Sequence, residues 1–352
     1  MRKAAGIGTG TSVRSAVLVW LAVLAAACSG TSAGQAASSP HPSESSGLES
    51  ASPILLAPMF SIDVPDPADM ELAFGSIWTG NHHQNSVTRI DPKTGEVEAT
   101  IRNVGYQVLA LVEADGALWA GSARDGMVRI DPDTNTVVAE VKGQVGDLAL
   151  GFGSLWATTF DHTVRRIDPS TGDVIATIEI GSGETDMRSW VAIDDAHQAV
   201  WVGVGDEGIV DRIDPRTDEI VATLGQVGDD PRVLISGGSV WIIGAEDQEL
   251  RRVDPSTNRA APDSIIDLSS SDFCAPRSTV GERIWFACSD GMLYQFEPSS
   301  GDVLAAFDLS EGHGYGAAGG IEFDGSIVWT ASTLGQVVRA FELPYSPASD
   351  PG

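Results

Sequence analysis

The sequence has 352 residues and carries 21 Lys and Arg against 49 Asp and Glu, a formal net charge of -28. Such an acidic chain repels phosphate backbones and anionic lipid, which argues against nucleic-acid binding and against docking on membranes through a basic patch. The length allows one large domain or two ordinary ones, and the charge suits a soluble protein, a cation or a basic partner.

The N-terminus is typical of an export signal. Three cations precede an apolar run over 16–27, which is too short for a bilayer core of about 20 residues but suits the apolar part of a signal peptide. The run ends in "LAAACSG" (24–30), which resembles a bacterial lipobox in which Cys28 is lipidated and becomes the mature N-terminus. We therefore expect residues 1–27 to be a lipoprotein signal and the protein to be anchored to the outer face of the cell membrane. Secretion after cleavage at an Ala-x-Ala site is the alternative.

Residues 28–51 are mostly Ser, Ala, Gly, Glu and Pro, with almost no large apolar side chains. Such a segment buries too little surface to offset the entropy of ordering it, so we expect a flexible tether starting at Cys28. One folded domain would follow over 52–347, with a short tail over 348–352. The lipid anchor would be the only attachment to the membrane.

A repeated segment runs through the rest of the chain, with an acid and a proline at its centre. Its copies are "TRIDPKTGEVEATI" (88–101), "VRIDPDTNTVVAEV" (128–141), "RRIDPSTGDVIATI" (165–178), "DRIDPRTDEIVATL" (211–224), "RRVDPSTNRAAPDSI" (251–265), "YQFEPSSGDVLAAF" (294–307) and "VRAFELPYSP" (338–347). A tryptophan series keeps the same rhythm: Trp78, Trp119, Trp156, Trp201, Trp241, Trp285 and Trp329. Both series give seven units with a step of roughly 42 residues, the size of one propeller blade.

Each unit has the pattern of four short strands. In the third unit they are "DLALGF" (147–152), "SLWATT" (154–159), "TVRRID" (163–168) and "DVIATIEI" (173–180). The fourth strand alternates apolar and polar residues, as expected of a half-exposed outer strand, whereas the first is apolar throughout. No stretch after the signal has helical periodicity. The pattern predicts an all-β, seven-bladed β-propeller.

The seventh unit lacks a fourth strand, and the N-terminal segment 58–65 has the right pattern to supply one. We expect this strand to complete the last blade and close the ring, which would leave no exposed sheet edge there. The Asp-Pro-x-Thr-Gly segments, such as 168–172, are predicted to be turns. Pro presets φ, Asp accepts backbone hydrogen bonds, and Gly permits a positive φ.

Function is expected where the repeats diverge. In a four-stranded blade, the loops between strands 2 and 3 and the links between blades share one face, here called the loop face. Its candidate ligand-binding residues are His82, His83, Asp161, His162, Arg188, Trp190, Arg232, Arg277, His313 and Tyr315.

These candidates fall into two groups. The histidines, together with Asp161, Glu184, Asp186 and Glu311, would suit an acid–base or divalent-metal site, although no short ligand spacing such as His-x-x-x-His occurs. Solvated loop histidines are the plainer interpretation. The arginines beside Trp190 would receive an anionic or aromatic ligand, or would simply pair with loop carboxylates.

Cys274 and Cys288 flank the turn "VGER" (280–283) almost symmetrically, which places them opposite one another on adjacent strands. In an oxidising compartment this register predicts a disulfide, which would stabilise the fold by about 3 kcal/mol.

The units, for example "IWTGNHHQNSVTRIDPKTGEVEATI" (77–101), resemble YVTN-type and NHL-like bacterial propellers over about 55–345. The resemblance implies the fold more than the function, because those families include binding proteins, scaffolds and enzymes. The chain is more distantly similar to virginiamycin B (streptogramin) lyase, whose family uses a divalent metal and a catalytic histidine in repeats with Pro-His-Gly before a first strand. The counterpart here is Pro231-Arg232-Val233, and the arginine argues against that chemistry.

Together these features predict an envelope-anchored, monomeric, non-catalytic propeller that binds a partner protein or a small ligand through its loop face, without a cofactor. The alternative is an extracytoplasmic enzyme of the lyase type, using a divalent metal. A structural role in the envelope is a third hypothesis. No nucleophile elbow, phosphate-binding glycine loop, HExxH or haem motif occurs in the sequence.

Overall fold

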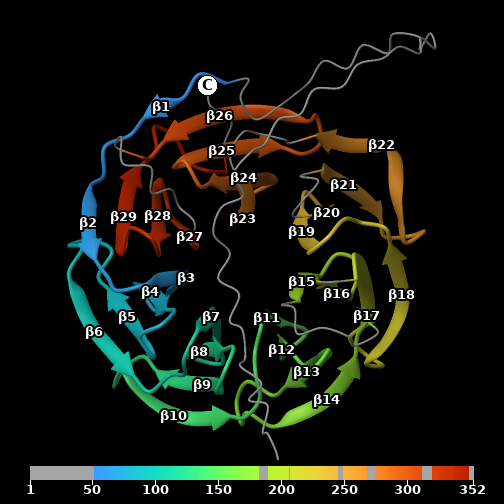
Figure 1. Ribbon diagram of the computed structural model, residues 1–352, viewed down its shortest axis with the longest axis horizontal. Helices are drawn as coiled ribbons and strands as arrows, with labels where there is room; N and C mark the ends of the chain where they lie inside the picture. The colour runs from blue at the N-terminus through green and yellow to red at the C-terminus, as the bar shows by residue number, and fades with distance from the viewer. Residues whose placement is uncertain are drawn as a thin grey trace, which may run out of the picture. The chain divides into compact units, whose positions relative to one another are not determined.

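The computed structural model describes residues 51–181, 189–205, 207–244, 249–267, 274–310 and 319–348. Every regular element in these residues is a β-strand, and the strands form seven separate sheets. Figure 1 shows the sheets placed radially, with the first strand of each nearest the centre and the last strand on the outside. The predicted all-β, seven-bladed propeller is therefore confirmed. The predicted signal segment and Cys28 lie outside the described residues.

The first three blades follow chain order. Blade 1 consists of β3 (Pro67–Ala73), β4 (Ser76–Asn81), β5 (Ser86–Ile90) and β6 (Val97–Arg102); blade 2 of β7 (Val108–Ala114), β8 (Ala117–Ser122), β9 (Gly126–Asp131) and β10 (Thr136–Val141); blade 3 of β11 (Asp147–Gly151), β12 (Ser154–Thr158), β13 (Thr163–Ile167) and β14 (Val174–Glu179).

The next blades repeat this order. Blade 4 consists of β15 (Trp190–Asp194), β16 (Ala199–Val204), β17 (Ile209–Asp214) and β18 (Glu219–Gly225); blade 5 of β19 (Arg232–Ser236), β20 (Ser239–Ile243), β21 (Glu249–Asp254) and β22 (Arg259–Asp267); blade 6 of β23 (Cys274–Val280), β24 (Arg283–Cys288), β25 (Met292–Glu297) and β26 (Asp302–Asp308).

Blade 7 combines the two ends of the propeller chain. Its strands are β27 (Ile321–Asp324), β28 (Ile327–Ser332), β29 (Val337–Glu342) and the N-terminal β2 (Phe60–Asp63), which pairs antiparallel with β29. A further strand, β1 (Ile54–Leu55), pairs in parallel with β26 and makes blade 6 five-stranded. That fifth strand was not expected from the sequence, because two residues carry no alternating pattern.

The tryptophan series forms the core between blades. Trp78, Trp119, Trp156, Trp201, Trp285 and Trp329 are fully buried, and Trp241 nearly so. In several blades the tryptophan on the second strand lies opposite an arginine on the third, as in the pair of Trp156 and Arg166, whose guanidinium carbon is 5.4 Å from the ring centroid. The indole is thus packed in the core while the arginine lies over the ring.

The Asp-Pro-x-Thr-Gly segments are turns, as predicted. Asp168 accepts hydrogen bonds from the hydroxyl and the backbone N–H of Ser170 and from the N–H of Thr171, and these hold its pKa below the ordinary value. Gly172 has a φ of 79°, a conformation that favours glycine.

These turns also join neighbouring blades. The arginine opposite the buried tryptophan reaches the turn of the next blade: Arg166 donates to the carbonyl of Pro215 at 2.8 Å and to Asp218 at 3.1 Å. Arg89 and Arg212 make the same bonds to Pro132 and Pro255. The turn is therefore both a bend and an anchoring point between blades.

Cys274 and Cys288 are paired in the register of β23 and β24 and form a disulfide, which confirms that prediction. In the part of the chain that the structure describes, no helix has the length and apolar character needed to cross a membrane.

Candidate functional site

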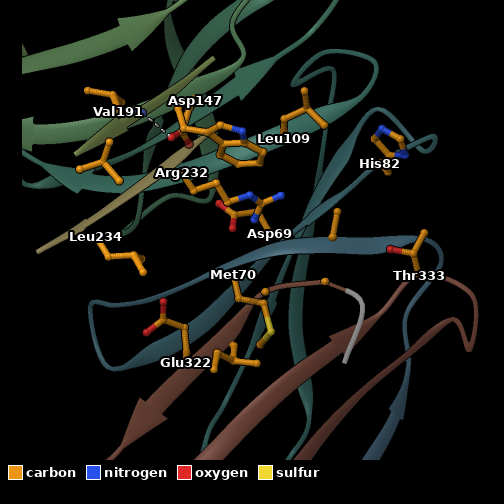
Figure 2. A pocket seen from close by; sticks show the side chains of 16 residues that line it. Asp69, Met70, His82, Leu109, Asp147, Val191, Arg232, Leu234, Glu322 and Thr333 are labelled. Carbon is orange, nitrogen blue, oxygen red and sulfur yellow. Dashed lines mark hydrogen bonds between the residues drawn. The ribbon is translucent and has the colours of Figure 1, made fainter. Parts of the chain in front are cut away.

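A cavity of about 400 Å³ lies where the first strands converge at the loop face (Figure 2). Residues near the beginnings of β3, β7, β11, β15 and β19 line it, together with residues of and just before β27, and His82 and Thr333 add side chains from loops that follow second strands. Figure 2 shows Asp69, Asp147 and Arg232 extending from different strands into this space. The walls are thus built from strands of six blades rather than from one loop.

Trp190 and Arg232 form a stacked pair in this cavity. The guanidinium carbon of Arg232 lies 3.7 Å from the centroid of the Trp190 ring, within the range of a cation–π interaction. The indole Nε1 of Trp190 donates to Asp230 at 2.8 Å, and the N–H of Asp230 donates to the carbonyl of Gly205. These bonds orient the ring, so the pair is organised before any ligand arrives.

Carboxylates of the cavity also join neighbouring blades. Asp69 accepts the N–H of Leu111 at 2.7 Å, and Asp147 accepts that of Val191 at 3.0 Å. In both pairs the acid lies on one first strand and the N–H on the first strand of the next blade. First strands are sheet edges, so these N–H groups would otherwise lack a backbone partner. The two acids therefore stabilise the arrangement of the blades and give the cavity negative charge.

Two further carboxyl groups, those of Glu71 on β3 and Glu322 on β27, have strongly raised pKa values. Burial raises the pKa of Glu71 to about 7, against a hydrogen bond from the N–H of Glu113 that lowers it. Burial also raises the pKa of Glu322 to about 8, and the charges of Glu71 and Asp69 add to this rise. Among the described residues neither group forms an ion pair. Around neutral pH Glu322 is therefore largely a neutral acid.

A second cavity, of about 260 Å³, adjoins the first on the side of blades 2 and 3. Its lining residues are His82, Gln107, Leu109, Ala123, Arg124, Gln144 and Phe160, of which His82 and Leu109 also line the central cavity. Backbone hydrogen bonds connect its walls: Gln107 donates to the carbonyl of His82 at 2.7 Å, and Ala123 donates to that of Gln107 at 3.0 Å.

The structure brings three of the predicted site residues, His82, Trp190 and Arg232, around the central cavity. His83 is exposed, with its ring 4.1 Å from that of His82, and its Nδ1 lies 3.8 Å from a carboxylate oxygen of Asp66. It borders the site without lining either cavity.

Asp161 and His162 make their contacts within or next to their own loop instead of lining the cavities. Asp161 accepts hydrogen bonds from the hydroxyls of Thr159 and Thr163 and pairs with Arg165. Partial burial acts to raise the pKa of Asp161, but these partners outweigh it and the pKa lies below the ordinary value. His162 has a positive φ of 58°, and its carbonyl accepts the N–H of Ile180.

The remaining candidates are placed only in part. Arg188, His313 and Tyr315, and with them Glu184, Asp186 and Glu311, lie outside the described residues. Arg277 lies in β23 next to a register irregularity, and its side chain is also outside what the structure describes. Within the described ranges, no group of three or more His, Cys, Asp or Glu is arranged to hold a metal ion.

Sequence reasoning missed the carboxyl groups of the central cavity: Asp69, Glu71, Asp147 and Glu322. A signal for two of them was present, because "ADMEL" (68–72) puts acids two residues apart in a first strand, where the sequence pattern predicts mainly apolar residues. Period two places both acids on one face of the strand. Because the first strands surround the centre of the propeller, acids on one face of such a strand indicate a polar central cavity.

Comparisons with known proteins agree with the fold. No protein-family model matches the chain, and no curated protein matches it. Among solved structures, the β-propeller domain of Cps50 (Swd1) from Myceliophteria thermophila is similar, with a TM-score of 0.64 and 12% sequence identity over 81% of this chain and 99% of that one. The chain shares the β-propeller fold. At this identity the likeness extends to the fold alone.

Proposed function

We propose that this chain is a non-catalytic binding protein of the cell envelope, held outside the membrane by a lipid on Cys28 and binding a small polar ligand in the central cavity of its loop face. The observation that carries the proposal is the Trp190–Arg232 stack. It places a flat, charged platform opposite the carboxylates of Asp69 and Asp147 in one cavity.

The cavity has the properties of a small-molecule site. Its volume of about 400 Å³ is in the range of ligand pockets, and its polar groups converge from several rigid strands. The hydrogen bonds of Asp69, Asp147 and Trp190 keep these groups in place, so little side-chain freedom is lost when a ligand binds. A β-propeller fold commonly presents such a face for binding, and the resemblance of the repeats to YVTN-type and NHL-like propellers agrees with this.

The arginine at position 232 argues against lyase chemistry. Arg232 stands where the lyase-like repeats carry a histidine, and it lines the cavity. A guanidinium remains protonated in proteins and accepts no hydrogen bond, so it cannot act as a general base. Its stacking on Trp190 instead suits recognition of a planar group.

A thermal-shift screen on the detergent-solubilised full chain tests the proposal. Amino acids, short peptides, sugars and nucleotides would be compared on the wild type, on Trp190→Ala and Arg232→Gln, and on Arg216→Gln as a control in an exposed turn on the opposite face. A ligand at 100 times its Kd stabilises by about 2.7 kcal/mol. We expect the shift to persist in the control and to disappear in both cavity variants. Equal shifts in all four proteins would contradict the proposal.

A further inference from the structure

The central cavity and the cavity beside blades 2 and 3 adjoin on the loop face, where His82 and Leu109 line both, and we treat the two together as one groove. We call it the loop-face groove: its central end is the cavity around Trp190 and Arg232, and its rim end is the cavity around Gln107 and Arg124. The backbone hydrogen bonds from Gln107 to His82 and from Ala123 to Gln107 hold its walls together. A groove of this form suits an elongated ligand rather than a compact one.

The central end is predominantly negative. The carboxylates of Asp69 and Asp147 line it beside the largely neutral acid Glu322, and Arg232 is the one permanently charged cation among the described lining residues. Glu71 lies next to Asp69 on the same face of β3 and adds to the field acting on Glu322. A cationic group is therefore favoured at this end, and an anionic group is opposed.

The rim end has the opposite character. Arg124 donates its Nε to the side-chain oxygen of Gln107 at 3.0 Å, and in the described part of the chain it forms no ion pair with a carboxylate. In a protein with 49 acidic residues, an arginine that lines a cavity and pairs with no acid among the described residues is suited to an anionic group of a ligand.

The middle of the groove suits amide groups. Gln107 and Gln144 each offer a donor and an acceptor, as a peptide unit requires, and Phe160 supplies an apolar surface for a side chain. A polyamine would match the central end but would meet Arg124 at the rim, and a phosphate ester would be opposed by the central carboxylates. A molecule with a cation at one end, amides between and an anion at the other matches all three parts.

We propose that the loop-face groove binds a short peptide with free termini, its N-terminal ammonium in the central end near Asp69 and Asp147 and its C-terminal carboxylate at Arg124. This inference rests on the proposed function and names the ligand class of that site. Side chains of the peptide would extend out of the groove, so the termini, rather than one particular residue, would be recognised.

Isothermal titration calorimetry on the full chain tests the two ends separately. The probes are tri-, tetra- and pentaalanine, each with free termini, with an acetylated N-terminus or with an amidated C-terminus. We expect at least one length to bind, and either capping to weaken its binding about tenfold or more, which corresponds to about 1.4 kcal/mol.

Two conservative variants should separate the effects. In Arg124→Gln the free and amidated peptides should bind equally, while acetylation still weakens binding. In Asp147→Asn the free and acetylated peptides should bind equally, while amidation still weakens binding. The amide oxygen of this asparagine can still accept the N–H of Val191, so the contact between blades is kept. Arg216→Gln and Asp173→Asn, in turns of the opposite face, are the matched controls and should behave as the wild type. Unchanged thermal midpoints would show that the variants are folded.

The inference is overturned if no alanine peptide binds, if capping leaves the affinity of the wild type unchanged, or if either variant removes both capping effects together. If peptides fail while another compound gives an Arg232-dependent thermal shift, the proposed function stands and only the peptide assignment falls. If nothing gives an Arg232-dependent shift, both fall.

Discussion

Replacing Glu322 with glutamine should make the propeller more stable at alkaline pH. Glu322 is a largely buried carboxyl on β27 whose pKa lies at about 8 because of burial and the charges of Glu71 and Asp69. The unfolded chain has an ordinary glutamate pKa near 4.5, so between these values the folded state binds more protons. The contribution of the neutral acid is complete below pH 4.5 and is lost as pH rises through about 8. Stability should therefore fall across this range.

The size of the effect follows from the shift. A change in pKa from 4.5 to about 8 corresponds to ~5 kcal/mol if it is fully expressed. Solvent reaching the cavity and movement of Glu71 away from Glu322 will relieve part of the repulsion. We therefore expect Glu322→Gln to raise the free energy of unfolding by roughly 1–2 kcal/mol at pH 9 and to change it little at pH 5.5.

Urea unfolding of the oxidised full chain at intervals from pH 5.5 to 9 measures this difference. Glutamine has the shape of the neutral acid, so a change in packing would shift the curve equally at all pH values, whereas loss of a titrating group changes its slope. Glu219→Gln, on the exposed outer strand β18, controls for the loss of one negative charge. Parallel curves for the wild type and Glu322→Gln over the whole range would refute the reasoning.

Three other perturbations test the fold and the anchor. Arg166→Lys should lower the free energy of unfolding by about 1–2 kcal/mol in urea, because an ammonium cannot keep the bonds to both Ser154 and Pro215; an unchanged midpoint would contradict a role in joining blades. The double substitution Cys274→Ser and Cys288→Ser should lower the free energy of unfolding by about 3 kcal/mol, because it removes the disulfide. Under reducing conditions the wild type also lacks the disulfide, so the difference in free energy between the two proteins should vanish. Cys28→Ala should move the protein from the membrane fraction to the soluble fraction on ultracentrifugation, and retention in the membrane would rule out the lipid anchor.

The architecture was predictable because its determinants are local and repeated. Each blade carries its own period-two strands and its own buried tryptophan, and the first five carry an Asp-Pro turn, so the count of seven needed no knowledge of contacts between distant residues. The Cys274–Cys288 pair was predictable for the same reason, since both residues belong to one hairpin whose turn sets the register.

The site was predictable only as a face of the molecule. His82, Trp190 and Arg232 were candidates because they interrupt the repeat, and the structure brings these three together. Asp161 and His162 interrupt it too, but their contacts are within their own loop. Divergence from a repeat marks where variation is tolerated, and it does not say which side chains converge.

The amino-acid sequence by itself determined the blade, its turns and the number of times it is repeated, because these follow from backbone preferences and alternation within a few residues. Only the tertiary structure decided the central cavity, the stacking of Arg232 on Trp190, and the raised pKa of Glu322. These depend on first strands that are far apart in the chain and meet only when the sheets are arranged around a centre. Burial and the proximity of like charges are properties of that assembled centre and of no single blade.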